Sequence, residues 1–264
     1  NGHDREPSWY RWSNKTEHIV IEEGITGIGS EAFAGFVKVL SVNIPYTVKK
    51  IKRSSFENNY RLREIQIPNE VNSIGDKAFA GCYGLKNLSL PSKLNYVGSF
   101  EFCRNIKSIS LPDSIKDTAD GMFTGCEMLT SVKLPRKLKA IKAYDFADCR
   151  KLTKLNIPVT VKVVYMSAFA GSGLKKIVLP SNVQKIRNGN DGQKVFEYIK
   201  GIGYPTKNLR VIKIHSKKVK SIQKNSFSGL SSKVVIKVPK SKKKKYTKML
   251  RKSGLSKKVK ICNL

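Results

Sequence analysis

The sequence is dominated by an internal repeat of about 23 residues. In the unit that ends at Pro91, IGDKAFAGCYGLKNLSLP, an Ala-Phe pair is followed three residues later by Cys and then by L-x-x-L-x-L-P. The closing proline recurs at spacings of 23, 23, 21, 23, 23 and 22 residues, at Pro45, Pro68, Pro91, Pro112, Pro135, Pro158 and Pro180. The repeat Phe recurs with nearly the same spacing, at Phe33, Phe56, Phe79, Phe100, Phe123, Phe146 and Phe169. Such a period predicts a solenoid, whose units bury their apolar faces by stacking.

Each unit has the pattern of one coil that contains a short strand. In LKNLSLP, Leu88 and Leu90 alternate with Asn87 and Ser89, and a period of two predicts a strand with one buried face. Pro91 has no N–H to donate, so it ends the ladder at the same place in every coil. We expect equivalent strands of successive coils to stack into a parallel sheet.

The repeat pattern IG-x-x-AF-x-x-C-x-x-L-x-x-I-x-LP resembles the BspA-type leucine-rich repeat of bacterial surface proteins and some parasitic protists. The match covers residues 19–239. The resemblance implies a right-handed leucine-rich-repeat superhelix of about nine coils, a solenoid built mostly of short parallel strands. It also implies a secreted or surface-displayed protein with a role in adhesion and without catalytic residues to carry over.

The chain divides into three expected parts, because both ends of a solenoid need a cover. Residues 1–18 form an N-terminal cap segment, 19–239 form the solenoid, and 240–264 form a basic C-terminal cap. We expect Trp9, Tyr10 and Trp12 to lie across the first coil, where the resembled family often has an aromatic segment. We expect the C-terminal cap to be a helix over 240–253 followed by a strand at 257–261, because the apolar residues of the helix are three and four apart.

The coils become irregular over residues 181–230. Gly- and Asn-containing stretches at 187–193 and 201–205 lengthen the path between the repeat positions. Insertions in a solenoid map to loops at its edge, often beside a binding face. Divergence of the repeat sequence without any functional role explains these longer stretches equally well.

Charge is distributed unevenly along the chain. It contains 51 Lys and Arg against 19 Asp and Glu, a formal net charge of +32. Residues 198–264 hold 21 of the basic residues and no acid. Such a field attracts acidic proteins, sulfated glycans, anionic cell-wall polymers or nucleic acid, and composition does not choose among them.

Lysines also accumulate on the outward positions of the expected sheet. The early coils have small neutral residues there, and the later coils have Lys133, Lys154, Lys176, Lys213 and Lys237. These five residues are candidate contacts for an elongated acidic ligand. The alternative is that lysine serves there as a soluble strand residue that discourages edge pairing.

The densest charge lies in the expected cap helix, at Lys242, Lys243, Lys244 and Lys245. A salt-sensitive polyanion contact and a solvated helix without a partner both fit this run. No stacking aromatics or groove-fitting motif accompanies it, which argues against a sequence-specific nucleic-acid reader.

Four cysteines repeat with the coil and do not form a metal motif. Cys82, Cys103, Cys126 and Cys149 each lie three residues past the repeat Phe, so we expect a structural ladder of buried free thiols. A disulfide between neighbouring coils is geometrically conceivable. Cys262 stands alone near the C-terminus, where it could pack in the cap or stay reactive.

No catalytic or cofactor-binding pattern is present. His3, His18 and His215 lack a Cys or acidic partner at a catalytic spacing, and the chain has no G-x-S-x-G, H-E-x-x-H or phosphate loop. No apolar run reaches the length that spans a membrane. We therefore expect no enzyme activity, no cofactor and no metal.

The sequence predicts a non-enzymatic binding protein. The first hypothesis is a surface or secreted protein that binds an acidic protein or glycan, with any targeting segment outside this chain. The second is a structural spacer that presents another domain, and the third is non-specific polyanion or nucleic-acid binding through the basic C-terminus.

Overall fold

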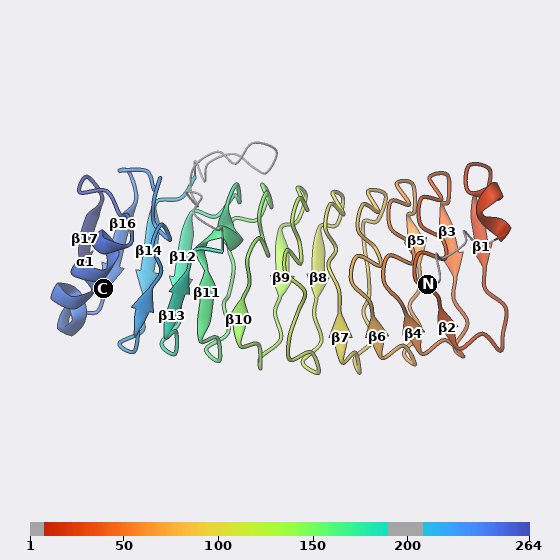
Figure 1. The fold of residues 1–264 in the computed structure, drawn as a ribbon, viewed down its shortest axis with the longest axis horizontal. Helices are drawn as coiled ribbons and strands as arrows, with labels where there is room; N and C mark the ends of the chain where they lie inside the picture. The colour runs from red at the N-terminus through yellow and green to blue at the C-terminus, as the bar shows by residue number, and fades with distance from the viewer. Residues whose placement is uncertain (1–7, 190–207) are drawn as a thin grey trace, which may run out of the picture.

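The computed structural model describes residues 8–189 and 208–264, and the protein is an elongated solenoid of about ten turns. The expected solenoid of short parallel strands is confirmed. Strand β1 and helix α1 lie at opposite ends of the rod, and most turns between them contribute to two rows of strands (Figure 1).

The first strand row precedes the repeat prolines and carries the outward lysines. In chain order it contains β1 (His18–Val20), β3 (Ser41–Asn43), β5 (Glu64–Ile65), β8 (Ser108–Ser110), β9 (Ser131–Lys133), β12 (Lys176–Leu179), β14 (Val211–Ile214), β16 (Val235–Val238) and β17 (Lys260–Asn263). The second strand row follows the prolines. It contains β2 (Gly27–Ile28), β4 (Lys50–Ile51), β6 (Ser73–Ile74), β7 (Tyr96–Val97), β10 (Ala140–Ile141), β11 (Val163–Tyr165), β13 (Lys185–Arg187) and β15 (Ser221–Ile222).

Strands pair in parallel with the equivalent strand of the next coil, but neither row is continuous. The first row divides into β1-β3-β5, β8-β9 and β12-β14-β16-β17, and the second into β2-β4-β6-β7 and β10-β11-β13-β15. The segment 87–90, whose alternation predicts a strand, joins the ladder only through an isolated bridge from Asn87 to Ser108. The side-chain alternation is therefore present where regular strand pairing is not.

A column of phenylalanine rings, the phenylalanine spine, runs through the core. From Phe33 to Phe169 the repeat rings stack on their neighbours with centroids 5.5–6.4 Å apart. The rings of Phe56 to Phe169 are almost completely buried. Stacking in the offset arrangement adds to the free energy gained from burying each ring.

The repeat cysteines have a structural role beside this spine. Each thiol is fully buried and donates a hydrogen bond to the carbonyl of the repeat Phe one coil earlier, at Sγ–O distances of 3.0–3.1 Å. Cys82, Cys103, Cys126 and Cys149 are all free. In the corresponding place of an earlier coil, the Asn59 side chain accepts a hydrogen bond from the Phe36 N–H at 2.8 Å. The position three residues after the repeat Phe therefore supplies a hydrogen-bond partner for a main-chain group of the preceding coil.

Aromatic residues cover the N-terminal end of the spine. A short 3-10 helix, Ser8–Trp12, places the ring centroid of Trp9 6.1 Å from that of Phe33. The Trp9 indole N–H donates a hydrogen bond to the Ala32 carbonyl at 2.8 Å. Tyr10 packs edge-on against Phe36. Trp12 lies beside its own neighbours in the chain, with the Arg11 guanidinium 5.4 Å and the Lys15 ammonium 5.9 Å from its ring centroid.

The C-terminal end is covered by helix α1 (Lys243–Lys252), which follows a 3-10 turn at Lys240–Lys242. Leu250 is fully buried, and the buried Tyr246 hydroxyl donates to the Ser216 carbonyl and accepts from the Val219 N–H. The strand expected at 257–261 begins later, at Lys260. The reason is a turn over residues 256–259, closed by a hydrogen bond from the Val259 N–H to the Ser256 carbonyl at 3.0 Å.

Removing one ring from the middle of the spine should be costly. Phe123 lies between Phe100 and Phe146, so Phe123→Ala leaves a cavity and should reduce the free energy of unfolding by about 3–5 kcal/mol. Urea unfolding followed by circular dichroism measures this loss. Phe102→Ala, at a side chain that is 40% exposed, should cost less than about 1 kcal/mol. Equal losses of unfolding free energy in the two variants would contradict a stabilising role for the stacked phenylalanine rings.

The five thiols should differ sharply in reactivity. Burial raises the pKa of Cys103 to about 12 and also raises the pKa of the other three repeat thiols, whereas Cys262 is only half-buried. Since the thiolate is the reactive form, we expect Ellman's reagent to modify Cys262 first in the folded protein and all five in denaturant. Cys262→Ser should leave no fast-reacting thiol, and a fast thiol remaining in that variant would contradict the burial of the repeat cysteines.

Candidate functional site

The outward lysines of the first strand row lie in two different registers. Lys213 of β14 is paired directly with Lys237 of β16, whereas Lys176 of β12 is paired with Val211. Lys133, Lys154 and Lys176 are exposed, and Lys213 and Lys237 are half-buried. The five predicted contact residues therefore share one face but do not form a single line.

The ladder of the first row is broken on both sides of residues 153–157. This segment lies between β9 and β12, and in the part of the chain that the structure describes it makes no main-chain hydrogen bond to either strand. Its inward residues Leu155 and Ile157 are only half-buried, whereas the equivalent Ile109 and Leu111 are buried.

The break opens a groove of about 550 Å³, the basic groove. It is lined by Thr153, Lys154, Leu155, Asn156, Ile157, Lys175, Lys176, Val178 and Pro180. Two predicted contact residues, Lys154 and Lys176, lie on opposite sides of it, and Lys175 adds a third ammonium group. The groove thus combines an apolar floor with basic sides and contains no acidic lining residue.

The 22-residue repeat that ends at Pro180 was the sequence signal for this groove. The missing residue lies between Phe169 and Pro180, which are 11 apart where other coils have 12. At this shortened turn Gly173 lies so close to the preceding coil that a Cβ there would be 2.1 Å from the Arg150 carbonyl oxygen. The shortened turn coincides with the loss of ladder pairing between 153–157 and β12.

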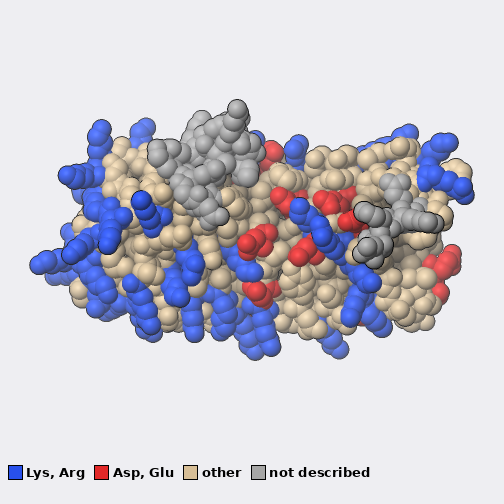
Figure 2. Space-filling model, in the orientation of Figure 1, with Lys and Arg blue, Asp and Glu red and all other residues tan. Residues whose placement is uncertain are grey.

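The basic run of the cap forms a second region at the end of the rod. Lys243, Lys244 and Lys245 are exposed on α1, and Lys242 is half-buried in the preceding turn. Strands β14 and β16 lie between this end and β12 in the sheet. On the face shown in Figure 2, basic side chains crowd the C-terminal half of the rod. The predicted lysines therefore divide into a groove region and a cap region.

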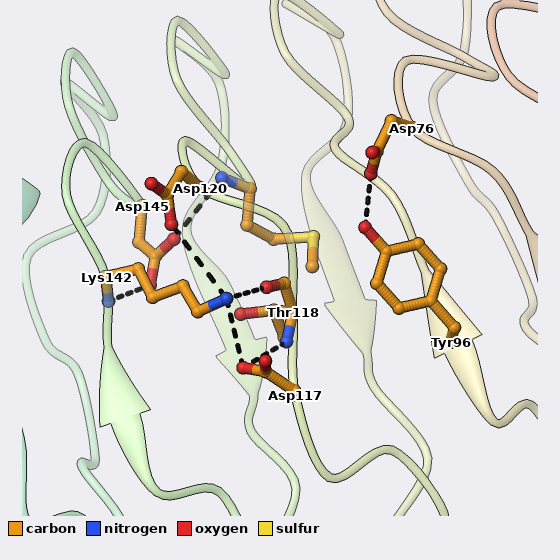
Figure 3. Close-up of polar contacts among 8 residues, drawn as sticks. Asp76, Tyr96, Asp117, Thr118, Asp120, Lys142 and Asp145 are labelled. Atoms are coloured by element: carbon orange, nitrogen blue, oxygen red, sulfur yellow. Dashed lines mark hydrogen bonds and ion pairs between the residues drawn. The ribbon is translucent and has the colours of Figure 1, made fainter.

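An acidic cluster that the sequence analysis missed lies at the break in the second strand row, between β7 and β10. There Thr118 occupies the position at which the strands of the second row have Ile or Val. The Lys142 ammonium donates a hydrogen bond to the main-chain carbonyl of Thr118 (Figure 3). The same ammonium is 3.1 Å from Asp117 and 3.9 Å from Asp120, and nearby the Tyr96 hydroxyl donates to Asp76.

Asp145 is the buried member of this neighbourhood. Its carboxyl oxygens accept hydrogen bonds from the main-chain N–H groups of Lys142 and Met122, at 2.7 and 3.4 Å, and so join two coils (Figure 3). Burial raises the pKa of Asp145 to about 8, although the two hydrogen bonds oppose the shift. The sequence signal was an Asp directly before the repeat Phe, where other coils have Ala, Ser or Met.

In the part of the chain that the structure describes, His18, His215 and Cys262 do not belong to a metal-binding cluster. Exposed His18 lies 2.8 Å from the Ser41 hydroxyl, and His215 is exposed, while His3 lies outside the described residues. Cys262 is paired with Lys237 across β16 and β17. Among residues 8–189 and 208–264 no group of three His, Cys, Asp or Glu side chains is placed to hold a metal ion.

The irregular stretches at 187–193 and 201–205 fall largely outside the described residues, so their placement as loops at the edge of the solenoid stays a prediction. Of the helices that the structure describes, none has the length and apolar character needed to cross a bilayer.

Comparison with known families and structures identifies the repeat. A family model for the BspA type leucine rich repeat region matches in six copies, at residues 6–104, 98–202 and 197–263. No curated relative matches the chain.

Solved bacterial leucine-rich-repeat structures share the fold. A leucine-rich repeat protein from Bacteroides ovatus is 26% identical, with a TM-score of 0.60 over 93% of this chain and 70% of that one. The T. pallidum leucine rich repeat protein is 29% identical, with a TM-score of 0.53 over 57% of this chain and 73% of that one. A leucine rich cell surface protein from Faecalibacterium prausnitzii is 20% identical, with a TM-score of 0.51 over 85% of this chain and 64% of that one.

Asp145 should make stability depend on pH. Because its pKa is about 8 when folded and about 3.9 when unfolded, the folded chain holds a proton between these values that the unfolded chain has released. The contribution to the free energy of unfolding is therefore full below about pH 4 and is lost as pH rises towards about 8. Asp145→Asn should flatten the pH dependence of the urea midpoint between pH 5 and pH 8. Exposed Glu70→Gln is the control, and an unchanged slope in the Asn variant would contradict the assignment.

Proposed function

The chain belongs to the BspA-type leucine-rich-repeat family, and on this premise we propose that it is a non-enzymatic surface or secreted protein that binds acidic macromolecules. Leucine-rich-repeat proteins bind macromolecules, and their family and fold are typically non-enzymatic. Adhesion to an acidic host protein, matrix glycan or neighbouring cell is the biological form of this activity that we propose.

The observation that carries the proposal is the basic groove. Lys154, Lys175 and Lys176 surround an apolar floor on the sheet face, and no acid lines the groove to neutralise them. Lysines on one face create a field that attracts an acidic partner and raises its rate of association. Lys133, Lys213 and Lys237 extend the same face to either side of the groove.

The surface or secreted location is supported by two observations. The matched family gives the repeat architecture, and the Faecalibacterium prausnitzii structure that shares the fold is described as that of a cell surface protein. Display outside the cell would place the basic face where acidic glycans and proteins are available.

A second contact through the cap is favoured by the exposure of Lys243, Lys244 and Lys245. These side chains carry three positive charges on successive residues of α1, without an acidic partner among the ion pairs of the described residues. We propose that the cap adds a non-specific polyanion contact to the more selective groove.

Heparin affinity chromatography tests the electrostatic part of this function. Lys154→Glu combined with Lys176→Glu should shift elution to clearly lower NaCl, because two attractive charges become repulsive and salt screens the remainder. Triple reversal at Lys243, Lys244 and Lys245 tests the cap separately. The matched control is Lys139→Glu with Lys162→Glu, two exposed lysines beside the second strand row. If groove and control variants elute together, the groove does not bind the polyanion.

A further inference from the structure

The basic groove is lined by a main-chain segment, residues 153–157, that lacks hydrogen bonds to the neighbouring coils in the described part of the chain, as well as by lysines. In a regular coil the strand bonds to both neighbours, as Lys213 of β14 does between Val178 and Lys237. Residues 153–157 lack these bonds on both sides within the described chain, and β12 pairs only with β14. A row of unpaired N–H and C=O groups is a template for another extended strand.

The side chains along the groove repeat with the period of a strand. On one side exposed Lys154 and Asn156 alternate with half-buried Leu155 and Ile157, and on the other Lys176 and Val178 face outward from β12. An extended ligand therefore passes basic and apolar groups in turn. Residues 153–157 span about 17 Å at a strand rise of about 3.3 Å per residue, which corresponds to a ligand of about five residues.

A second groove shows what distinguishes the basic one. Where β5 fails to pair with the next coil, a groove of about 630 Å³ is lined by residues that include Arg63, Glu64 and Lys86. There a carboxylate accompanies the basic groups. The basic groove has three lysines and no carboxylate, so charge complementarity selects an acidic occupant.

We propose that the basic groove binds an extended peptide of about five residues with acidic side chains at alternate positions, whose main chain hydrogen-bonds to the unpaired groups of residues 153–157. This proposal rests on the proposed function and gives its partner a chemical class. A sulfated glycan can also contact the lysines, but it does not carry donors and acceptors that alternate at the spacing of a strand.

The probe is a fluorescently labelled acetyl-Glu-Val-Glu-Val-Glu-amide, with binding to the full chain followed by fluorescence anisotropy. Two further peptides carry N-methyl groups, one on both valines and the other on the first, third and fifth residues. In an extended chain these two sets of N–H groups point to opposite edges, and only one edge faces the groove. We expect one methylated peptide to bind about tenfold more weakly and the other to bind within about twofold of the parent peptide.

Charge variants locate the site. Lys154→Glu with Lys176→Glu should weaken the parent peptide at least about tenfold, whereas Lys139→Glu with Lys162→Glu should change affinity less than about twofold. Lys86→Glu places a reversed charge in the second groove and should likewise have little effect. Retention of circular dichroism and of the urea midpoint shows that each variant is folded.

The outcomes separate this proposal from the proposed function. Equal binding of the two methylated peptides, whether both strong or both weak, overturns pairing through one edge. Failure of the parent peptide to bind, while heparin retention still depends on Lys154 and Lys176, overturns the peptide and leaves an acidic glycan as the partner of the groove. Loss of groove dependence for both heparin and peptide overturns the proposed function itself.

Discussion

Stacking of one coil on the next is the interaction on which the whole structure depends. A single coil of about 23 residues cannot enclose its own apolar side chains, but the repeat Phe, Leu and Ile residues of adjacent coils bury one another. The phenylalanine spine and the Cys-to-carbonyl hydrogen bonds connect the coils inside. Because this packing is repeated from end to end, both terminal coils need covers, which Trp9 and Tyr246 help to provide.

Interruption of the outer ladders is compatible with this continuous core. The first strand row loses pairing around residues 153–157 and the second around Thr118, yet the repeat Phe residues beneath them remain buried. Polar side chains gather at both of these interruptions: three lysines at one, and Asp117, Asp120 and Lys142 at the other. The departures from the repeat therefore create the local sites, and the repeat supplies a rigid support for them.

The period of the sequence was sufficient to predict the solenoid, the parallel strands and the burial of the repeat residues. Alternation also placed Lys154 and Lys176 on one outward face, because successive strand residues point to opposite sides of a sheet. The exposed lysines of the cap follow in the same way from the spacing of Tyr246 and Leu250 on one helical face. These inferences needed only contacts that recur at a fixed separation along the chain.

Only the tertiary structure decided where the ladders break. Hydrogen bonding between coils depends on the separation and tilt of main chains about 23 residues apart, which side-chain alternation does not specify. LKNLSLP has the alternation of a strand and forms a single bridge, whereas the one-residue deletion before Pro180 coincides with an open groove. Burial of Asp145 likewise followed from the packing of its neighbours. The sequence by itself determined the coil and its outward lysines, and the packing of coil on coil determined which lysines surround a groove.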